Sequence, residues 1–242
     1  MNILVVNDDG IKAIGIKILA TALLKYGNVY VVAPDRPRSA ASHKVILHKP
    51  LSFEAVDEIE GAICYKTSGM PADCVRLATG ILDVKFDLVF SGVNNGLNLG
   101  TDTIYSGTVA GAREALIEGI PSVAVSTDFD SFDIVTNEIE NVLAKVFDEK
   151  LYSSEYILNI NFPTKKFNES IGYKVCRQGV KIFDTKFKKN ADGLYDVKSE
   201  EEIHDQNPDT DVYLADAGYI TLVPLGFDNT NYKEIDNLNN KI

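Results

Sequence analysis

The chain has 242 residues, a formal net charge of −11 at pH 7 and a hydrophobic content of 45%. This length allows one α/β domain or two small ones, with a sizeable core. The acidic balance disfavours a protein that binds nucleic-acid polymers or anionic membranes, because both need a basic face. A small anionic substrate stays open, since a bound cation can reverse the field of one cleft.

The cysteines Cys64, Cys74 and Cys176 form no CxxC pair. Their low, odd number fits unbridged thiols in a reducing compartment. Met1 stands directly before an expected strand, so we expect no signal peptide. No apolar run reaches the ~20 residues that a membrane helix needs. These features predict a cytoplasmic protein without a membrane partner.

The first elements alternate between strand and helix. Residues 2–7 are apolar without alternation, which is typical of a strand covered on both faces. Apolar residues recur at helical spacing over 14–23, and Gly27 closes this helix. A second apolar run, 29–33, completes a β-α-β unit whose strands should be parallel. The polar stretch 35–43 is expected to be a loop.

Further strands and helices follow in chain order. The expected strands are 45–47, 51–56, 62–66, 87–91, 122–126 and 157–161. The expected helices are 71–79, with Pro71 at its first position, 108–118 and 134–147. Directly after residue 91 comes the polar stretch GVNNGLNLGTDTIYSGT. We expect it to be a functional loop, because loops of this length inside compact domains are usually functional or disordered.

The character of the chain changes after Gly172, where short strands and charged turns begin. One more apolar strand is expected at 219–224, and the tail from Asn229 is too polar to fold alone. We predict an α/β fold with a doubly wound, mostly parallel sheet as the catalytic core, residues 1–165. A β-rich C-terminal extension with the tail, residues 166–242, is expected to take part in oligomerisation.

Three polar segments are predicted to meet at one edge of this sheet. Asp8-Asp9-Gly10 follows the first strand, a loop with Arg36, Arg38 and Ser39 follows the second, and Asn94, Asn95 and Asn98 follow the strand 87–91. Ligands of open α/β sheets bind beyond the carboxyl ends of the strands. We therefore expect these three loops to converge on one cleft.

The polar groups in this cleft are nearly all oxygen donors, which Mg²⁺, Mn²⁺ and Ca²⁺ prefer. A divalent ion would neutralise the like charges of Asp8 and Asp9, which repel each other and are costly to bury. The alternative is that the pair forms only a turn or a helix cap. Arg36 and Arg38 are expected to be solvated or ion-paired.

Ser106-Gly107-Thr108 stands directly before the helix expected at 108–118. The simplest interpretation is an N-cap. Helix N-termini with small residues also bind phosphate through free N–H groups. The chain has no GxGxxG, GxxxxGK[ST] or GxSxG motif, so dinucleotide, P-loop and esterase chemistry are not indicated.

Several long motifs occur in one order along the chain. They are NILVVNDDGI, VVAPDRPRSAAS, MPADCVRLA, DLVFSGVNNGLNLGTDTIYSGTVAGA, GIPSVAVS and TDVYLADAGYITLVPL. In this order they resemble the SurE family, the stationary-phase survival proteins, which are 5′/3′-nucleotidases. The resemblance implies a Rossmann-like core and a homodimer or homotetramer with exchanged C-terminal elements.

The resemblance also implies a metal-dependent 5′/3′-nucleotidase that hydrolyses nucleoside monophosphates to nucleoside and phosphate. One divalent ion, Mg or Mn, would be bound by Asp8, Asp9, Ser39 and Asn94. Asn98 and Ser106 match positions that bind phosphate. Two alternatives stay open: a broad-specificity acid phosphatase or exopolyphosphatase with the same metal site, and a non-catalytic nucleotide-binding protein.

The chain departs from the usual family pattern at a few positions. It has NDDGIKAIG, with Lys12 and Ile14, where many members have NDDGxxAPG, and Ala40 stands where Gly is frequent. These changes concern substrate preference or loop rigidity rather than the metal site.

As a mechanism, we expect Asn98, Ser106 and the N–H groups of Gly107 and Thr108 to hold the phosphate oxygens. Asp8 or Asp9 would accept a proton from the attacking water. The nucleoside needs a separate pocket, for which residues near Met70 and the β-rich extension are candidates. Tyr105 would either stack on the base or pack beside the helix start.

Overall fold

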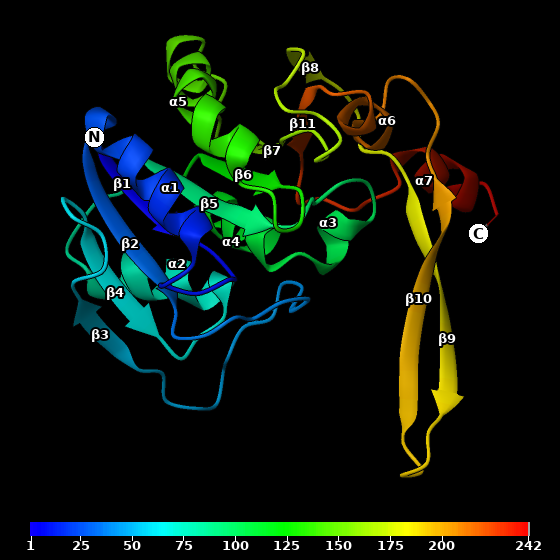
Figure 1. Cartoon of the computed structure of the whole chain (residues 1–242), viewed down its shortest axis with the longest axis horizontal. Helices are drawn as coiled ribbons and strands as arrows, with labels where there is room; N and C mark the ends of the chain where they lie inside the picture. The colour runs from blue at the N-terminus through cyan, green and yellow to red at the C-terminus, as the bar shows by residue number, and fades with distance from the viewer. Residues whose placement is uncertain (242) are drawn as a thin grey trace.

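The computed structural model describes residues 1–241 and is built on a nine-stranded mixed sheet with a separate two-stranded hairpin (Figure 1). In spatial order the strands of the sheet are β3 (Phe53–Val56), β4 (Ile63–Thr67), β2 (Asn28–Pro34), β1 (Asn2–Val6), β5 (Leu88–Asn95), β6 (Ser122–Thr127), β7 (Ile157–Asn161), β11 (Ile220–Leu225) and β8 (Tyr173–Val175). The run from β4 to β7 is parallel throughout. The predicted mostly parallel sheet is therefore confirmed.

Helices cover both faces of this sheet. They are α1 (Ile14–Leu23), the 3-10 helix η1 (Leu24–Tyr26), α2 (Pro71–Ile81), α3 (Asp102–Tyr105), α4 (Gly107–Ile117), α5 (Asp133–Asp148), α6 (Asp211–Asp216) and α7 (Tyr232–Asn239). Helices α1 and α5 lie on one face, and α2 and α4 lie on the other. Ile3 and Val5 of β1 pack on the side of α1 and α5, whereas Leu4 and Val6 pack on the side of α2. This alternation buries both faces of β1, as its continuous apolar sequence predicted.

Two local predictions were wrong. Residues 45–47 do not form a strand, because the N–H of Ile46 donates to the carboxylate of Asp73 at the start of α2 instead of to a neighbouring strand. The stretch after residue 91 is not one long loop. Strand β5 continues to Asn95, and α3 forms within the predicted loop.

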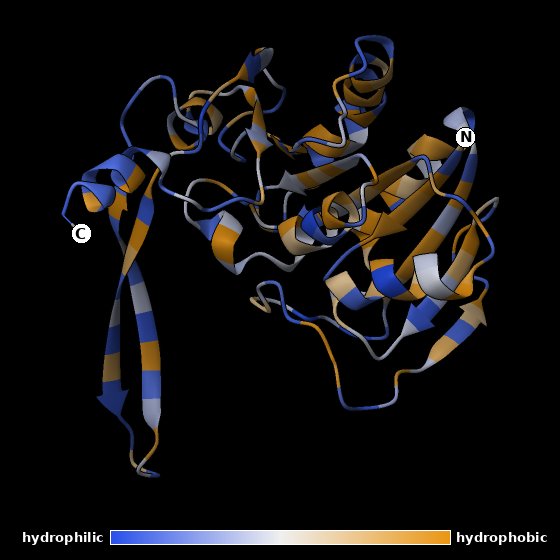
Figure 2. Ribbon diagram, turned by 180° about the vertical axis from the view of Figure 1, so that it is seen from behind, coloured by the Kyte–Doolittle hydropathy of each residue, from blue (hydrophilic) through white to orange (hydrophobic). Residues whose placement is uncertain are grey.

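The C-terminal part divides between the main sheet and a projecting hairpin. Strand β11 pairs antiparallel with β7, and β8 pairs parallel with β11. The hairpin consists of β9 (Lys181–Lys189) and β10 (Tyr195–His204) and extends away from the body. Figure 2 shows hydrophobic residues concentrated in the main sheet, while hydrophilic and hydrophobic residues alternate along the hairpin.

The predicted division into residues 1–165 and 166–242 remains a prediction, and the main sheet crosses that boundary at β7 and β11. The polar tail contains α7, which buries none of its residues. Within residues 1–241, no helix combines the length and apolar character that crossing a bilayer requires.

Candidate active site

The loops that follow β1, β2 and β5 meet at the carboxyl edge of the sheet. The N–H of Arg38, in the loop after β2, donates to the main-chain oxygen of Asp8 at 2.7 Å. The N–H of Asn95, at the end of β5, donates to Oδ2 of Asp9 at 3.0 Å. These contacts bring together the three segments that the sequence placed at strand ends, because β1 lies between β2 and β5.

The chain turns sharply just after the two aspartates. The buried side chain of Asn7 donates from Nδ2 to Gly10 O at 3.0 Å and accepts from Gly10 N at 3.1 Å. Gly10 has φ +99°, and an added Cβ would lie 3.3 Å from the main-chain carbon of Arg36. Only glycine combines this backbone angle with such a close approach. The turn directs Asp8 and Asp9 out of β1 toward the neighbouring loops.

The carboxylate of Asp8 lies against the first turn of α4. Its Oδ1 accepts a hydrogen bond from Oγ1 of Thr108, and its side chain is almost fully buried. An added Cβ at Gly107 would lie only 2.8 Å from Oδ2 of Asp8, so glycine permits this contact. Burial is the main cause that raises the pKa of Asp8 from 3.8 to about 6, and the charge of Asp9 raises it further.

Asp9 is also desolvated. Burial raises the pKa of its carboxyl group, and the hydrogen bond from the N–H of Asn95 opposes that shift. No basic side chain in the described chain forms an ion pair with Asp8 or Asp9. Two partly or fully buried carboxylates therefore stand side by side without a positive partner, which is costly unless a cation neutralises them.

The other predicted metal ligands lie near the end of β5 and in the loop after β2. Asn94 donates from Nδ2 to Gly96 O at 2.6 Å, which leaves its Oδ1 available as an oxygen donor. Ser39 is exposed and follows Arg38 directly in the loop bonded to Asp8. Two carboxylates, one hydroxyl and one amide oxygen form a donor set that suits a hard divalent ion. Within residues 1–241 no group of three or more His, Cys, Asp or Glu is placed to bind a metal, and the predicted set contains only two acidic ligands.

The predicted phosphate contacts lie at the start of α4. Ser106 is the N-cap, and its Oγ accepts from Val109 N at 3.0 Å, so the capping interpretation is confirmed. The hydroxyl of Thr108 donates to Oδ1 of Asp8. The N–H groups of Gly107 and Thr108 belong to the first turn, where no intrahelical acceptor exists. The partial positive charge of these N–H groups lies at the end of α4 that Asp8 contacts.

Asn98 is held by buried polar residues of β6 and β7. Its N–H donates to Asn161 Oδ1 at 2.8 Å, and its carbonyl accepts from Asn159 Nδ2 at 3.0 Å and Asn161 Nδ2 at 3.1 Å. Its own Nδ2 donates to Ser126 Oγ at 2.8 Å. Sequence reasoning missed Asn159, Asn161 and Ser126. The signal was two asparagines at alternate positions of the buried strand ILNIN.

The loop that carries Ser39 is fixed at its far end. Ser42 donates from its N–H to Tyr105 O at 3.0 Å and from Oγ to Ile104 O at 2.8 Å. Ala40 and Ser42 have φ values of +51° and +50°. The left-handed angle at Ala40 explains why glycine is favoured at this position. Arg38 donates to Asp35 Oδ1 at 3.1 Å, so the predicted ion pairing of this arginine is confirmed.

Comparisons with known proteins agree with this architecture. A family model described as "Survival protein SurE" matches residues 3–185. Two relatives named "5′-nucleotidase SurE", from the Clostridium botulinum strains 657 / Type Ba4 and Eklund 17B / Type B, are 40% and 39% identical. Each alignment covers 98% of this chain and 97% of the relative.

The crystal structure of the SurE protein from Aquifex aeolicus superposes with a TM-score of 0.83 at 36% identity, covering 100% of this chain and 99% of that chain. These matches include β5 with Asn94 and the loops that carry Asp8 and Ser39. The resemblance predicted from the motifs is thereby confirmed. The chain belongs to the SurE family.

Proposed function

We propose that this protein is a metal-dependent 5′/3′-nucleotidase that hydrolyses nucleoside monophosphates to nucleoside and inorganic phosphate. One observation carries the proposal: the carboxylate of Asp8, which has no basic partner, lies against the first turn of α4 with its free N–H groups, and Asp9 adds a second negative charge beside Asp8. A cation site next to an anion site suits a phosphate ester. The names of the Clostridium botulinum relatives support the same activity.

The metal is proposed to be one Mg²⁺ or Mn²⁺ ion. Asp8, Asp9, Ser39 and Asn94 would bind it, since their oxygen donors and the unneutralised charge of the two carboxylates fit a hard divalent cation. When bound, such an ion polarises a phosphoryl oxygen and offsets developing negative charge. It also removes the repulsion between the two buried carboxylates.

The protein groups position the phosphate and handle the proton. The N–H groups of Gly107 and Thr108, with Asn98 and Ser106, hold the non-bridging oxygens, which carry most of the transition-state charge. A water oxygen forms the new bond to phosphorus while the bond to the nucleoside oxygen breaks. Asp8 or Asp9 accepts the water proton, and the departing nucleoside oxygen takes up a proton from solvent.

The test is phosphate release from a panel of nucleoside 5′- and 3′-monophosphates with Mg²⁺ or Mn²⁺, and again with EDTA. We expect release from several nucleotides that EDTA abolishes. Preferential release from polyphosphate or simple phosphate esters would favour the phosphatase alternative. Nucleotide binding without release would favour a non-catalytic binding protein. Equal release with and without EDTA would contradict the metal site.

We also propose that the protein works in the cytoplasm as a homodimer or homotetramer. The free thiols of Cys64, Cys74 and Cys176 support a reducing compartment. The helix α7 supports assembly, because it buries none of its residues while Ile235 and Leu238 are 42% and 58% exposed. A second copy of the chain would cover these side chains.

A further inference from the structure

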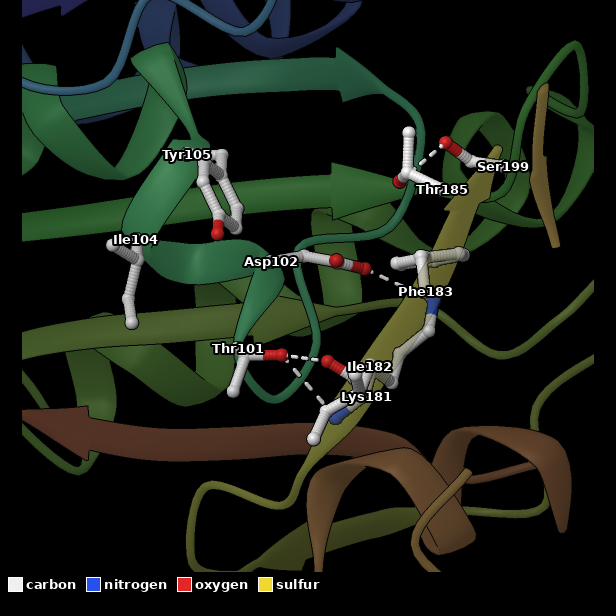
Figure 3. Close-up of a pocket in the computed structure, with 9 residues that line it drawn as sticks. All are labelled: Thr101, Asp102, Ile104, Tyr105, Lys181, Ile182, Phe183, Thr185 and Ser199. Atoms are coloured by element: carbon white, nitrogen blue, oxygen red, sulfur yellow. Dashed lines mark hydrogen bonds and ion pairs between the residues drawn. The ribbon is translucent and has the colours of Figure 1, made fainter. Parts of the chain in front are cut away.

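We propose that a cavity between α3 and the base of the β9–β10 hairpin binds the nucleoside half of the substrate, with its base between Tyr105 and Phe183. This inference rests on the proposed nucleotidase activity and adds the residues that recognise the leaving group. The cavity has a volume of about 660 Å³, which is within the range of small-molecule sites. Figure 3 shows residues of α3 on one side of the cavity and residues of β9 on the other.

Two aromatic rings line this cavity without another aromatic partner. Tyr105 ends α3 and is 63% exposed, and Phe183 lies on β9 and is 40% exposed. Neither ring stacks on another aromatic ring within residues 1–241. The exposure of Tyr105 favours the alternative in which its ring stacks on a base. Exposed aromatic faces at a cavity suit a planar ligand, because every nucleobase has a face that stacks.

Tyr105 links the cavity to the proposed phosphate site along the chain. Tyr105 directly precedes Ser106, the N-cap of α4, whose first turn offers the free N–H groups. The main chain of Tyr105 is held by Ser42, which belongs to the same loop as Ser39. A nucleotide bound with its phosphate at the start of α4 would therefore have its nucleoside within reach of Tyr105. Met70 does not line this cavity.

The walls of the cavity are joined to each other. Lys181 of β9 donates from Nζ to Asp102 Oδ2 of α3 at 3.0 Å, and Thr101 Oγ1 donates to the main-chain oxygen of Lys181. The ammonium of Lys181 also lies 5.3 Å from the ring centre of Phe183. These contacts fix the base of the hairpin against α3, so the two rings belong to one preformed site rather than to a loose loop.

The lining predicts how selective the site is. Only two hydroxyls, those of Thr185 and Ser199, stand on the hairpin side, and they bond to each other at 3.0 Å. Asp102 is already paired with Lys181. With few free polar groups to read the edges of a base, recognition depends on stacking. We therefore expect similar affinity for adenine and guanine, and weaker binding of pyrimidines because their rings offer less stacking area.

The test compares two substrates that share ribose and phosphate. Adenosine 5′-monophosphate carries the base, and ribose 5-phosphate lacks it. For Tyr105→Ala and Phe183→Ala, we expect the ratio of kcat/KM for adenosine 5′-monophosphate over ribose 5-phosphate to fall about tenfold, because base–aromatic stacking is worth roughly 1–3 kcal/mol. Tyr105→Phe keeps the aromatic ring, so this variant should keep the ratio of the unmodified protein. An unchanged ratio in both alanine variants would overturn the inference.

Two variants serve as matched controls. Phe187 and Tyr195 are exposed aromatics of the same hairpin, at 65% and 62%, and neither lines the cavity. Phe187→Ala and Tyr195→Ala should keep the substrate ratio of the unmodified protein. An equal fall in these controls would assign the effect to the hairpin as a whole and contradict a specific site.

A binding measurement separates this inference from the proposed function. Calorimetry with adenosine alone, in the presence of EDTA, needs neither turnover nor metal. We expect adenosine to bind the unmodified protein and to bind Tyr105→Ala about tenfold more weakly. This result without any phosphate release would sustain the nucleoside site while the nucleotidase proposal fails. Release from nucleotides without any effect of Tyr105→Ala on adenosine binding would do the reverse.

Discussion

Asn161 holds the main chain of Asn98 through two hydrogen bonds. Its Oδ1 accepts from the N–H of Asn98 at 2.8 Å, and its Nδ2 donates to the carbonyl of Asn98 at 3.1 Å. Asn161 is fully buried in β7, where an apolar residue would otherwise be expected. A buried amide in a strand interior is tolerated only when its hydrogen bonds are made. Here they fix the residue proposed to contact phosphate.

Replacing Asn161 should therefore weaken phosphate binding through Asn98. For Asn161→Ala we expect kcat/KM to fall about 10- to 100-fold, because small misplacements of positioning groups have effects of this size. The inhibition constant for inorganic phosphate should rise in parallel. In an Asn98→Ala background, the same substitution should have little further effect, since the side chain that it positions is already gone.

Ser122→Ala is the matched control for this prediction. Ser122 is also buried, and its Oγ donates to Ala112 O at 2.7 Å, away from Asn98. Removing this hydroxyl should lower stability by about 1 kcal/mol and leave phosphate inhibition unchanged. If Asn161→Ala and Ser122→Ala lowered activity only in proportion to stability, the positioning role of Asn161 would be wrong.

A methyl group at residue 107 should disturb the site directly. In Gly107→Ala the added Cβ would lie 2.8 Å from Oδ2 of Asp8, so the carboxylate or the helix start must shift. We expect loss of most activity and weaker binding of divalent metal, measured by kinetics and calorimetry. Gly80→Ala provides the control, because an added Cβ there meets nothing within 4 Å. That variant should be fully active and slightly more stable, since alanine favours α2.

The buried carboxylate of Asp8 makes stability depend on pH when no metal is bound. Its pKa is about 6 in the folded protein against 3.8 ordinarily, so between these values the folded state binds more protons than the unfolded chain. Stability therefore falls as the pH rises from about 4 to about 6, by at most about 3 kcal/mol. Burial of Asp9 acts in the same direction.

Urea unfolding of metal-free protein at several pH values measures this effect. Asp8→Asn has no charge to bury, so its stability should lack most of the fall seen between pH 4 and 6. Adding Mg²⁺ or Mn²⁺ should reverse the trend for the unmodified protein, because metal binds the deprotonated carboxylates. Identical pH profiles for the two proteins would show that Asp8 is not destabilised by burial.

Removal of the tail after Gly226 tests its proposed role in assembly. The tail contains α7, whose exposed apolar side chains would be covered by a partner subunit. We expect the truncated protein to have a lower mass in solution, measured by light scattering, while the main sheet keeps its circular dichroism. An unchanged oligomer after truncation would mean that other surfaces hold the subunits together.

The sequence predicted the central elements well, because each depends on a local pattern. Apolar runs identified β1 and β2, helical spacing identified α1 and α5, and Pro71 marked the start of α2. The predictions were less successful where distant residues decide the structure. The N–H of Ile46 goes to Asp73 rather than to a strand, and β11 joins β7 across a long insertion.

In the candidate site, too, features set by local sequence were predictable and features set by distant residues were not. Asp8 and Asp9 follow β1 and Asn94 lies near the end of β5, and the local sequences identify both strands, so the meeting of these residues at one edge was predictable. The support of Asn98 by Asn161 was not, because it joins residues 63 positions apart and needs the pairing of β6 with β7. That Tyr105 and Phe183 line one cavity likewise depends on where the hairpin leaves the sheet.

The most direct test of the proposed metal centre is the effect of Asp8→Asn on metal-dependent phosphate release from adenosine 5′-monophosphate. We predict that the variant folds, keeps its circular dichroism and loses turnover at every Mg²⁺ or Mn²⁺ concentration, while Asp83→Asn, at an exposed position, remains active. A variant with the kcat of the unmodified protein would contradict the assignment of Asp8, and with it the metal centre on which the proposed chemistry depends.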